Sequence, residues 1–159
     1  MTSQEYTRIV NLYIDDVKRV AFASCKTAYD SEDITQTVFM KLLKYGGKFE
    51  SDEHVKKWLI RVTVNECRSF WRSPWKKRVD YFVPEGASAG IPDHSGENVI
   101  LDAINSINRK CREIVSLYYY EEYSVKEIAE ILGISEAAVL KRLQRTREAI
   151  KQYLTKGQG

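Results

Sequence analysis

Apolar residues recur every three to four positions along most of the chain, a spacing that predicts α-helices. No segment alternates apolar and polar residues for long enough to indicate a β-strand. Gly46-Gly47 and Ser73-Pro74 are expected to end two of the helices, because glycine and proline disfavour helix continuation. The pattern predicts helices over Ser3–Thr27, Ser31–Tyr45, Ser51–Arg72, 98–107, 109–121, 125–132 and 135–154.

The segment Val83–Gly96 separates the first three of these helices from the rest. It contains two of the chain's three prolines, three glycines and almost no large apolar residue, which is typical of a linker. The expected fold is therefore all-α, with two small helical bundles joined by a flexible acidic linker. The expected boundaries are 1–78 for the first bundle, 79–97 for the linker and 98–159 for the second bundle.

The helix expected over Ser51–Arg72 has apolar residues on two sides, one containing Leu59 and the other Val64. A helix with this pattern lies inside a bundle, with only a narrow face left open. The open stripe carries four cations and one amide. They are Lys57, Arg61, Asn65, Arg68 and Arg72.

A second cationic cluster follows this helix directly, with an aromatic residue in it: Trp75, Lys76, Lys77 and Arg78. Cations follow a phosphate backbone and aromatic rings stack on unpaired bases, so the stripe and this cluster predict binding to single-stranded or opened DNA. Core packing is the expected role of Trp58 and the favoured role of Trp71. For Trp75, packing and base stacking remain equally open.

The segment Tyr123–Leu143 has the pattern of a helix-turn-helix. Ser124 and Glu127 form a capping box at the start of a short helix, and Gly133 permits the positive φ of a tight turn. Ser135 is expected to cap the following helix, whose inner face contains Val139, Leu143, Thr146 and Ile150.

The outer face of this last helix is small at its N-terminus and basic further along. Such a face suits the major groove of duplex DNA, although a solvated basic face is the alternative for the stripe taken alone. The stripe predicts DNA contacts at Ala137, Lys141, Gln144 and Arg145, with Arg142 and Arg147 flanking it, and Ser135 and Ala138 are expected at the N-terminal end of the same surface.

The net charge of +3 is unevenly distributed, with +5 over residues 1–78, −4 over 79–98 and +2 over 99–159. Two basic blocks separated by an acidic tether can both face a polyanion. The 43% of apolar residues indicates a globular protein, and the chain shows neither a membrane-spanning run nor a signal peptide at its polar N-terminus. A cytoplasmic protein is expected.

Three cysteines stand far apart at Cys25, Cys67 and Cys111, and the expected role is that of buried, reduced thiols. Without a Cys-x-x-Cys pair, and with only two histidines, no metal site or other cofactor is expected. The chain also offers no nucleophile–base pair, paired carboxylates or glycine-rich phosphate loop, which argues against an enzyme.

Three segments in order resemble one family, the extracytoplasmic-function (ECF) sigma factors of RNA polymerase. Residues 30–44, DSEDITQTVFMKLLK, resemble the family's polymerase-binding helix. Residues 54–73, HVKKWLIRVTVNECRSFWRS, resemble its downstream promoter-element helix, and residues 112–150 resemble its upstream-element reader. The chain departs from the usual family pattern at Ser69, Ile107-Asn108 and Ala137-Ala138.

The resemblance implies a transcription initiation factor with core RNA polymerase, promoter DNA and an anti-sigma factor as partners. It assigns Asp33 and Gln36 to the polymerase contact, and the helical wheel adds Thr37 and Met40 to the same outer arc. The inner arc of this helix is expected to hold Ile34, Val38, Phe39, Leu42 and Leu43.

The resemblance further implies that Asn65, Arg68, Arg72 and the loop 74–78 capture an extruded base. It places Leu140, Lys141, Gln144 and Arg145 at the upstream element. Two alternatives remain open: an ordinary helix-turn-helix regulator with a sensor domain, and a sigma-like interaction module without promoter function.

Overall fold

The computed structural model describes residues 1–25, 27–73, 103–104 and 106–156. The expected linker and the Trp75–Arg78 cluster lie outside these residues. The described part is helical and contains no strand, as the sequence predicted. Its elements are α1 (Ser3–Cys25), α2 (Ala28–Lys44), α3 (Asp52–Arg72), α6 (Arg109–Val115), the π-helix η1 (Ser116–Tyr120), α7 (Val125–Leu132) and α8 (Glu136–Lys156).

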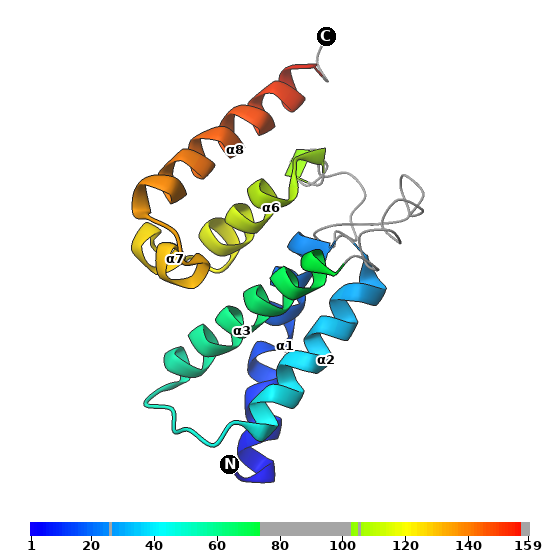
Figure 1. The fold of residues 1–159 in the computed structure, drawn as a ribbon, viewed down its shortest axis with the longest axis vertical. Helices are drawn as coiled ribbons and strands as arrows, with labels where there is room; N and C mark the ends of the chain where they lie inside the picture. Colours follow the sequence, from blue (N-terminus) through cyan, green and yellow to red (C-terminus); the bar gives the residue numbers. More distant parts are fainter. Residues whose placement is uncertain (26, 74–102, 105, 157–159) are drawn as a thin grey trace.

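Helices α1, α2 and α3 pack against one another and form what we call the N-terminal lobe (Figure 1). Each helix contributes buried apolar side chains to one common core. This core contains Ile9, Val17, Ala21, Cys25, Ile34, Val38, Phe39, Leu42, Val55, Leu59, Cys67 and Phe70.

Side-chain caps set the helix boundaries of this lobe. Thr27 lies just before α2 and accepts a hydrogen bond from the amide of Asp30 at 3.2 Å, so α2 begins at Ala28 and not at Ser31. The sequence predicted that α1 extends to Thr27, but in the structure α1 ends at Cys25. Ser51 caps α3 by accepting from the amide of His54 at 3.1 Å, and α3 ends at Arg72 as predicted.

Helices α6, α7 and α8, together with η1, form the C-terminal lobe (Figure 1). Ser124 accepts from the amide of Glu127 at 3.1 Å, and its own amide donates to the Glu127 carboxylate at 3.2 Å. Gly133 has φ +67°, a left-handed conformation in which an L side chain is strained. Ser135 then accepts from the amide of Ala138 at the start of α8. The predicted helix-turn-helix is confirmed.

The helix expected over residues 109–121 changes type within its length. It is α-helical up to Val115 and continues as the π-helix η1. The amide of Glu121 donates to the carbonyl of Ser116, five residues back, at 2.9 Å. Glu122 follows with φ +59° and ends the helix. The extra residue in this turn rotates Glu121 away from the position that continuous α-helical spacing predicts.

The two lobes share apolar cores that the sequence pattern did not reveal. Val20, Ile60 and Val64 of the N-terminal lobe are buried in one cluster with apolar residues of η1, α6, α7 and α8. Ala23 of α1 is buried in another, with Ile104 and residues of α6. In Figure 1 the C-terminal lobe accordingly lies directly above α1 and α3. The two bundles are therefore present, and in this structure they are docked on each other.

All three cysteines are buried and carry thiols, as predicted. Within the described ranges, no helix is both long and apolar enough to cross a lipid bilayer.

The capping box of α7 provides a stability test. Ser124→Ala removes the acceptor for the Glu127 amide, so the free energy of unfolding should fall by about 1 kcal/mol. Urea denaturation followed by circular dichroism measures this change. Ser69→Ala, at an exposed position within α3, is the matched control and should change stability by less than about 0.5 kcal/mol. Equal losses in the two variants would contradict the capping role.

Candidate functional site

The cationic stripe of α3 lies where the sequence predicted, between the two buried sides of the helix. Arg61, Asn65 and Arg72 are exposed, whereas Lys57 and Arg68 are half-buried. The stripe combines an amide with four positive charges on one helix face. Such a surface can contact phosphates and a base edge together.

Helix α7 of the C-terminal lobe lies against this stripe. The Lys57 ammonium is 2.9 Å from the Glu130 carboxylate, and the Arg68 guanidinium donates to the carbonyl of Leu132. Lys57, Lys126 and Arg61 also act on Glu130 electrostatically, and Lys57, which donates to the carboxylate, makes the largest contribution to lowering its pKa. Sequence reasoning missed these contacts, because Glu130 and Lys57 are far apart along the chain and no periodicity relates them.

The two tryptophans of α3 serve in packing. Trp58 stacks obliquely on Tyr45 with ring centroids 4.8 Å apart. The Trp71 indole N–H donates to the Ser24 hydroxyl at 3.0 Å, and the Arg109 guanidinium lies 4.8 Å from the centre of the Trp71 ring. Trp75, whose role was left open, lies outside the described residues together with Lys76, Lys77 and Arg78.

The expected DNA-reading face of α8 is open to solvent. Val139, Leu143 and Thr146 are buried, and Ile150 is half-buried, so the inner face is as predicted. Among the predicted DNA contacts, Ala138 and Arg142 are half-buried. The exposed ones are Ser135, Ala137, Leu140, Lys141, Gln144, Arg145 and Arg147.

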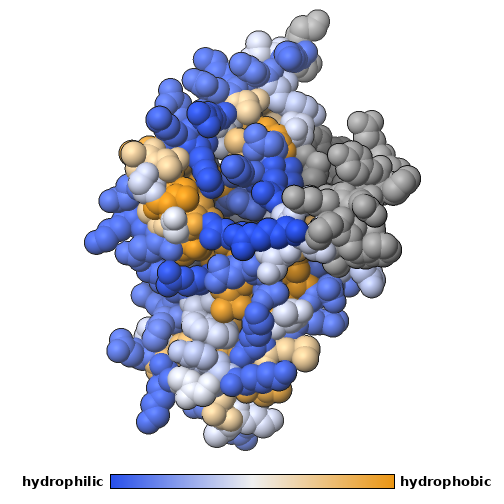
Figure 2. Space-filling model, viewed as in Figure 1, coloured by the Kyte–Doolittle hydropathy of each residue, from blue (hydrophilic) through white to orange (hydrophobic). Residues whose placement is uncertain are grey.

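Arg147 of α8 forms a hydrogen bond with a residue outside its own helix. Its Nε donates to the hydroxyl of Tyr119, in η1, at 3.0 Å. Leu140, a large apolar side chain of the same helix, is 56% exposed. Figure 2 shows that hydrophilic side chains cover most of the face of the molecule on view.

The outer arc of α2 forms a third surface. Asp33, Gln36 and Met40 are exposed, with Met40 at 56%, while Thr37 is half-buried and its hydroxyl donates to the carbonyl of Asp33 at 3.1 Å. The prediction that Leu43 belongs to the inner arc is wrong, because Leu43 is 62% exposed. It lies one residue past Leu42, about 100° around the helix and beyond the edge of the core. Leu43 therefore extends the apolar part of this surface.

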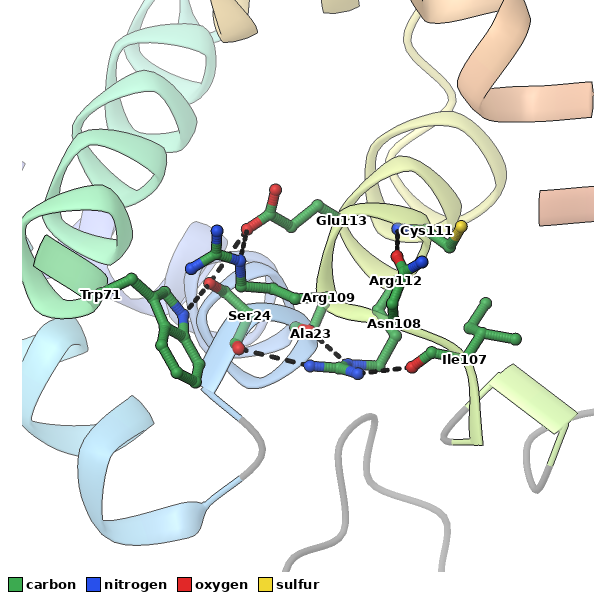
Figure 3. A network of polar contacts seen from close by, with 9 residues as sticks. All are labelled: Ala23, Ser24, Trp71, Ile107, Asn108, Arg109, Cys111, Arg112 and Glu113. Atoms are coloured by element: carbon green, nitrogen blue, oxygen red, sulfur yellow. Dashed lines mark hydrogen bonds and ion pairs between the residues drawn. The ribbon is translucent and has the colours of Figure 1, made fainter. Parts of the chain in front are cut away.

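A polar network joins the lobes at the C-terminal end of α1 (Figure 3). Arg112 of α6 is buried, and its guanidinium donates to the carbonyls of Ala23 at 2.8 Å, Ile107 at 2.6 Å and Ser24 at 3.5 Å. The Ser24 hydroxyl donates to the Glu113 carboxylate at 3.1 Å. Carbonyls in the last turn of a helix lack partners within it, so α6 supplies a cap for α1 from the other lobe.

Glu121 is the second buried charged residue between the lobes. Its carboxylate lies 2.9 Å from Arg19 of α1 and 3.1 Å from Lys56 of α3. Burial raises the pKa of Glu121, and the nearby Asp16 raises it further, against the opposing effect of Lys56. The ion pairs thus offset only part of the cost of removing this carboxylate from water.

Comparisons with known proteins cover both lobes. Residues 9–77 match the family model of sigma-70 region 2, and residues 97–150 match that of sigma-70 region 4. RNA polymerase sigma factor SigV of Bacillus subtilis is 30% identical, over 89% of this chain and 86% of its own. The ECF RNA polymerase sigma factor SigW of the same species is 27% identical, over 94% and 88%.

A longer relative and a solved structure extend this likeness. The probable RNA polymerase sigma factor RfaY of Xanthomonas campestris is 29% identical over 95% of this chain, which spans only 40% of RfaY. The sigma factor RpoE of Bartonella quintana, in a co-crystal structure with the anti-sigma factor NepR, superposes with a TM-score of 0.74. It covers 96% of this chain and 98% of its own at 21% identity, which shows a common fold.

The raised pKa of Glu121 predicts a pH-dependent stability. Because the folded state binds this proton more tightly than the unfolded chain, where the pKa is near 4.5, the group stabilises the fold at low pH. That contribution is lost as the pH rises through the raised pKa. Glu121→Gln abolishes the titration, so the variant should gain stability relative to wild type as the pH increases from about 4.5 toward neutrality.

Urea denaturation across this pH range measures the difference in unfolding free energy. Glu122→Gln makes the same chemical change at the exposed neighbouring position and serves as the matched control. A difference between wild type and Glu121→Gln that does not vary with pH would contradict the assignment.

Proposed function

Because this chain belongs to the ECF group of sigma-70 RNA polymerase sigma factors, which act in promoter recognition and transcription initiation, we propose that its two lobes read different parts of one promoter. Residues 1–78 bind core polymerase and the downstream element, residues 98–159 bind the upstream element, and residues 79–97 connect them. The observation that carries this proposal is that a single chain holds both a cationic stripe on α3 and a helix-turn-helix with an open reading face.

The α3 stripe is the candidate for the opened strand. Arg61, Asn65, Arg68 and Arg72 project from one face of a helix that is otherwise buried, so the core fixes their spacing. Binding an extruded base recovers part of the cost of unstacking it, which is a few kcal/mol per base. The cluster Trp75–Arg78 continues the stripe in sequence and would extend the same contact. The downstream element is therefore held open after melting.

The α8 face is the candidate for the upstream duplex. Ala137 and Ala138 leave room for the N-terminus of α8 to approach base edges, and Lys141, Gln144 and Arg145 follow on the exposed side. A recognition helix uses its N-terminal residues in this way. Ser135, Leu140 and Arg142 border the face, and we expect Arg147 to contact a phosphate. This lobe would position the protein before any strand opens.

The outer arc of α2 is the candidate surface for core polymerase. Asp33 and Gln36 provide an exposed charge and an exposed amide, and Met40 adds an adaptable apolar anchor. Thr37 lies between them and shares the surface. A charged rim around an exposed apolar centre is typical of a protein–protein interface.

Membership of this family also bears on a further protein partner and on the compartment in which the chain acts. The Bartonella quintana RpoE structure contains the anti-sigma factor NepR, and we propose that an anti-sigma factor also regulates this chain. The chain would act in the cytoplasm and perform no chemistry of its own, with catalysis left to core polymerase. No cofactor is required for this role.

The polymerase contact gives the first test of the proposal. Asp33→Arg combined with Gln36→Ala should abolish co-purification with core polymerase, because the charge at Asp33 is reversed and the amide of Gln36 is lost while the buried side of α2 is unchanged. Pull-down with tagged core enzyme measures binding, and circular dichroism checks the fold. Asp15→Arg, the same change at an exposed position of α1, is the control and should still co-purify. Undiminished binding of the double variant would remove α2 from the polymerase interface.

The recognition helix gives the second test. Arg145→Ala should weaken promoter use by about 1–3 kcal/mol and relax the preference at one upstream position, as loss of a base-edge contact does. Arg147→Ala should instead weaken binding to all sequences alike, because a phosphate contact carries no sequence information. Mobility-shift assays of the polymerase complex on a promoter library distinguish the two. Equal changes in sequence preference would show that the face is assigned wrongly.

A further inference from the structure

Tyr119 of η1 and Arg147 of α8 form a contact between two elements of the C-terminal lobe. The Arg147 Nε donates to the Tyr119 hydroxyl at 3.0 Å, although the two residues are 28 positions apart in the sequence. Both side chains are exposed, Tyr119 by 48%. The hydrogen bond to Tyr119 makes the largest contribution to raising the pKa of Arg147. An exposed arginine is thus held by a residue that the sequence pattern did not relate to it.

The π-helix η1 sets the direction of the Tyr119 side chain. A π-turn is wider than an α-turn and rotates the side chains that it carries, and such turns are frequent at functional sites. The Tyr119 ring also packs edge-on against Tyr118, with centroids 4.9 Å apart and an interplanar angle of 80°. Arg147 comes from α8, which Leu143 and Thr146 anchor in the lobe by their burial. Packing of two separate elements therefore sets the position of the hydroxyl relative to the guanidinium.

The hydrogen bond leaves phosphate-binding groups on both residues. A guanidinium carries five N–H groups, and Nε supplies only one of them. The two terminal nitrogens of Arg147 keep the planar fork that matches a phosphate. The Tyr119 oxygen accepts from Nε and still has its own proton to donate. One phosphate can therefore accept hydrogen bonds from both side chains.

Arg147 lies where α8 would leave the major groove of duplex DNA. Ala137, at the base-reading end of α8, precedes it by ten residues, which is about 15 Å along the helix axis. The major groove is about 12 Å wide. A side chain this far along a recognition helix meets the sugar-phosphate backbone, as the C-terminal end of such a helix does in homeodomains. Exposed Lys151 lines the same hollow as Tyr119 and Arg147 and adds a second positive charge there.

We propose that Tyr119 and Arg147 form one phosphate-binding unit, in which the Tyr119 hydroxyl positions the Arg147 guanidinium and donates to the same phosphate. The ligand is a backbone phosphate of the upstream duplex. The inference rests on the phosphate contact proposed above for Arg147, and it adds an uncharged residue to that contact. An arginine that is held before binding loses less side-chain entropy when the DNA arrives, so the hydroxyl raises the affinity.

Removal of the hydroxyl is the first test. In complex with core polymerase, Tyr119→Phe should bind a duplex promoter fragment about two- to tenfold more weakly than wild type, as loss of one hydrogen-bonding group does. The same factor is expected on non-promoter duplex, because a phosphate contact carries no sequence information. Tyr153→Phe is the matched control, at a tyrosine of α8 that is 39% exposed, and should bind as wild type does. Mobility-shift assays measure the affinities, and circular dichroism checks the fold. Wild-type affinity of Tyr119→Phe would overturn the proposal.

The salt dependence of binding separates positioning from a merely structural role. Arg147→Ala should lower the slope of log affinity against log salt by about 1. Tyr119 carries no charge, so its hydroxyl affects this slope only through Arg147. Tyr119→Phe should therefore lower the slope in the same direction, and should cost less than about twofold in affinity when residue 147 is already alanine. An unchanged slope, or equal costs in both backgrounds, would overturn the positioning role.

A neutral linkage in the DNA locates the contact. A methylphosphonate replaces one charged phosphate oxygen with a methyl group, and it is placed singly at each position along both strands of the upstream element. One linkage should weaken binding of wild type and leave Arg147→Ala and Tyr119→Phe nearly unaffected. If Tyr119→Phe is as sensitive as wild type at every linkage, the hydroxyl serves no phosphate and the proposal is wrong.

The inference and the proposed function fail in distinguishable ways. If Arg147→Ala lowers the salt slope while Tyr119→Phe behaves as wild type, Tyr119 is not part of the site and the phosphate contact of Arg147 stands. If Arg147→Ala changes neither the affinity nor the slope, the contact proposed for Arg147 fails, and the inference about Tyr119 fails with it.

Discussion

Burial of Ile60 and Val64 against the C-terminal lobe is the contact on which the rest of the structure depends. These residues lie on one side of α3, while Val55, Leu59 and Phe70 of the same helix belong to the core of the N-terminal lobe. A helix buried on both sides has little freedom to rotate, because rotation in either direction would expose apolar area. The narrow polar stripe of α3 is therefore held at a fixed angle between two cores.

The polar groups at the contact between the lobes make that contact specific. Arg112 is buried with its guanidinium satisfied by main-chain carbonyls, and a displaced lobe would leave those hydrogen bonds unmade. Glu121 is paired with Arg19 and Lys56 from two different helices of the N-terminal lobe, yet burial raises its pKa. The contact between the lobes thus includes one buried charge whose hydrogen bonds are satisfied, that of Arg112, and one whose burial costs free energy, that of Glu121. A contact composed in this way favours a single arrangement without being so stable that it cannot be reversed.

Docking of the lobes covers part of one candidate surface and leaves two others open. Two cations of the α3 stripe, Lys57 and Arg68, contact α7 through Glu130 and the Leu132 carbonyl. Meanwhile the reading face of α8 and the outer arc of α2 stay open in the docked state.

The sequence by itself determined the features that depend on local interactions. Helical periodicity, the Ser124–Glu127 capping box, the Gly133 turn and the end of α3 at Arg72 all depend on residues within a few positions of one another, and the structure has each of them as predicted. The inner face of α8 and the burial of the cysteines followed equally from spacing and residue type. Only the tertiary structure decided which apolar side of α3 faces which lobe, that Leu43 lies outside the core, and that η1 turns Glu121 inward. Those outcomes depend on the shapes of surfaces that meet between residues far apart in the sequence, for which a linear pattern of apolar and polar positions carries no signal.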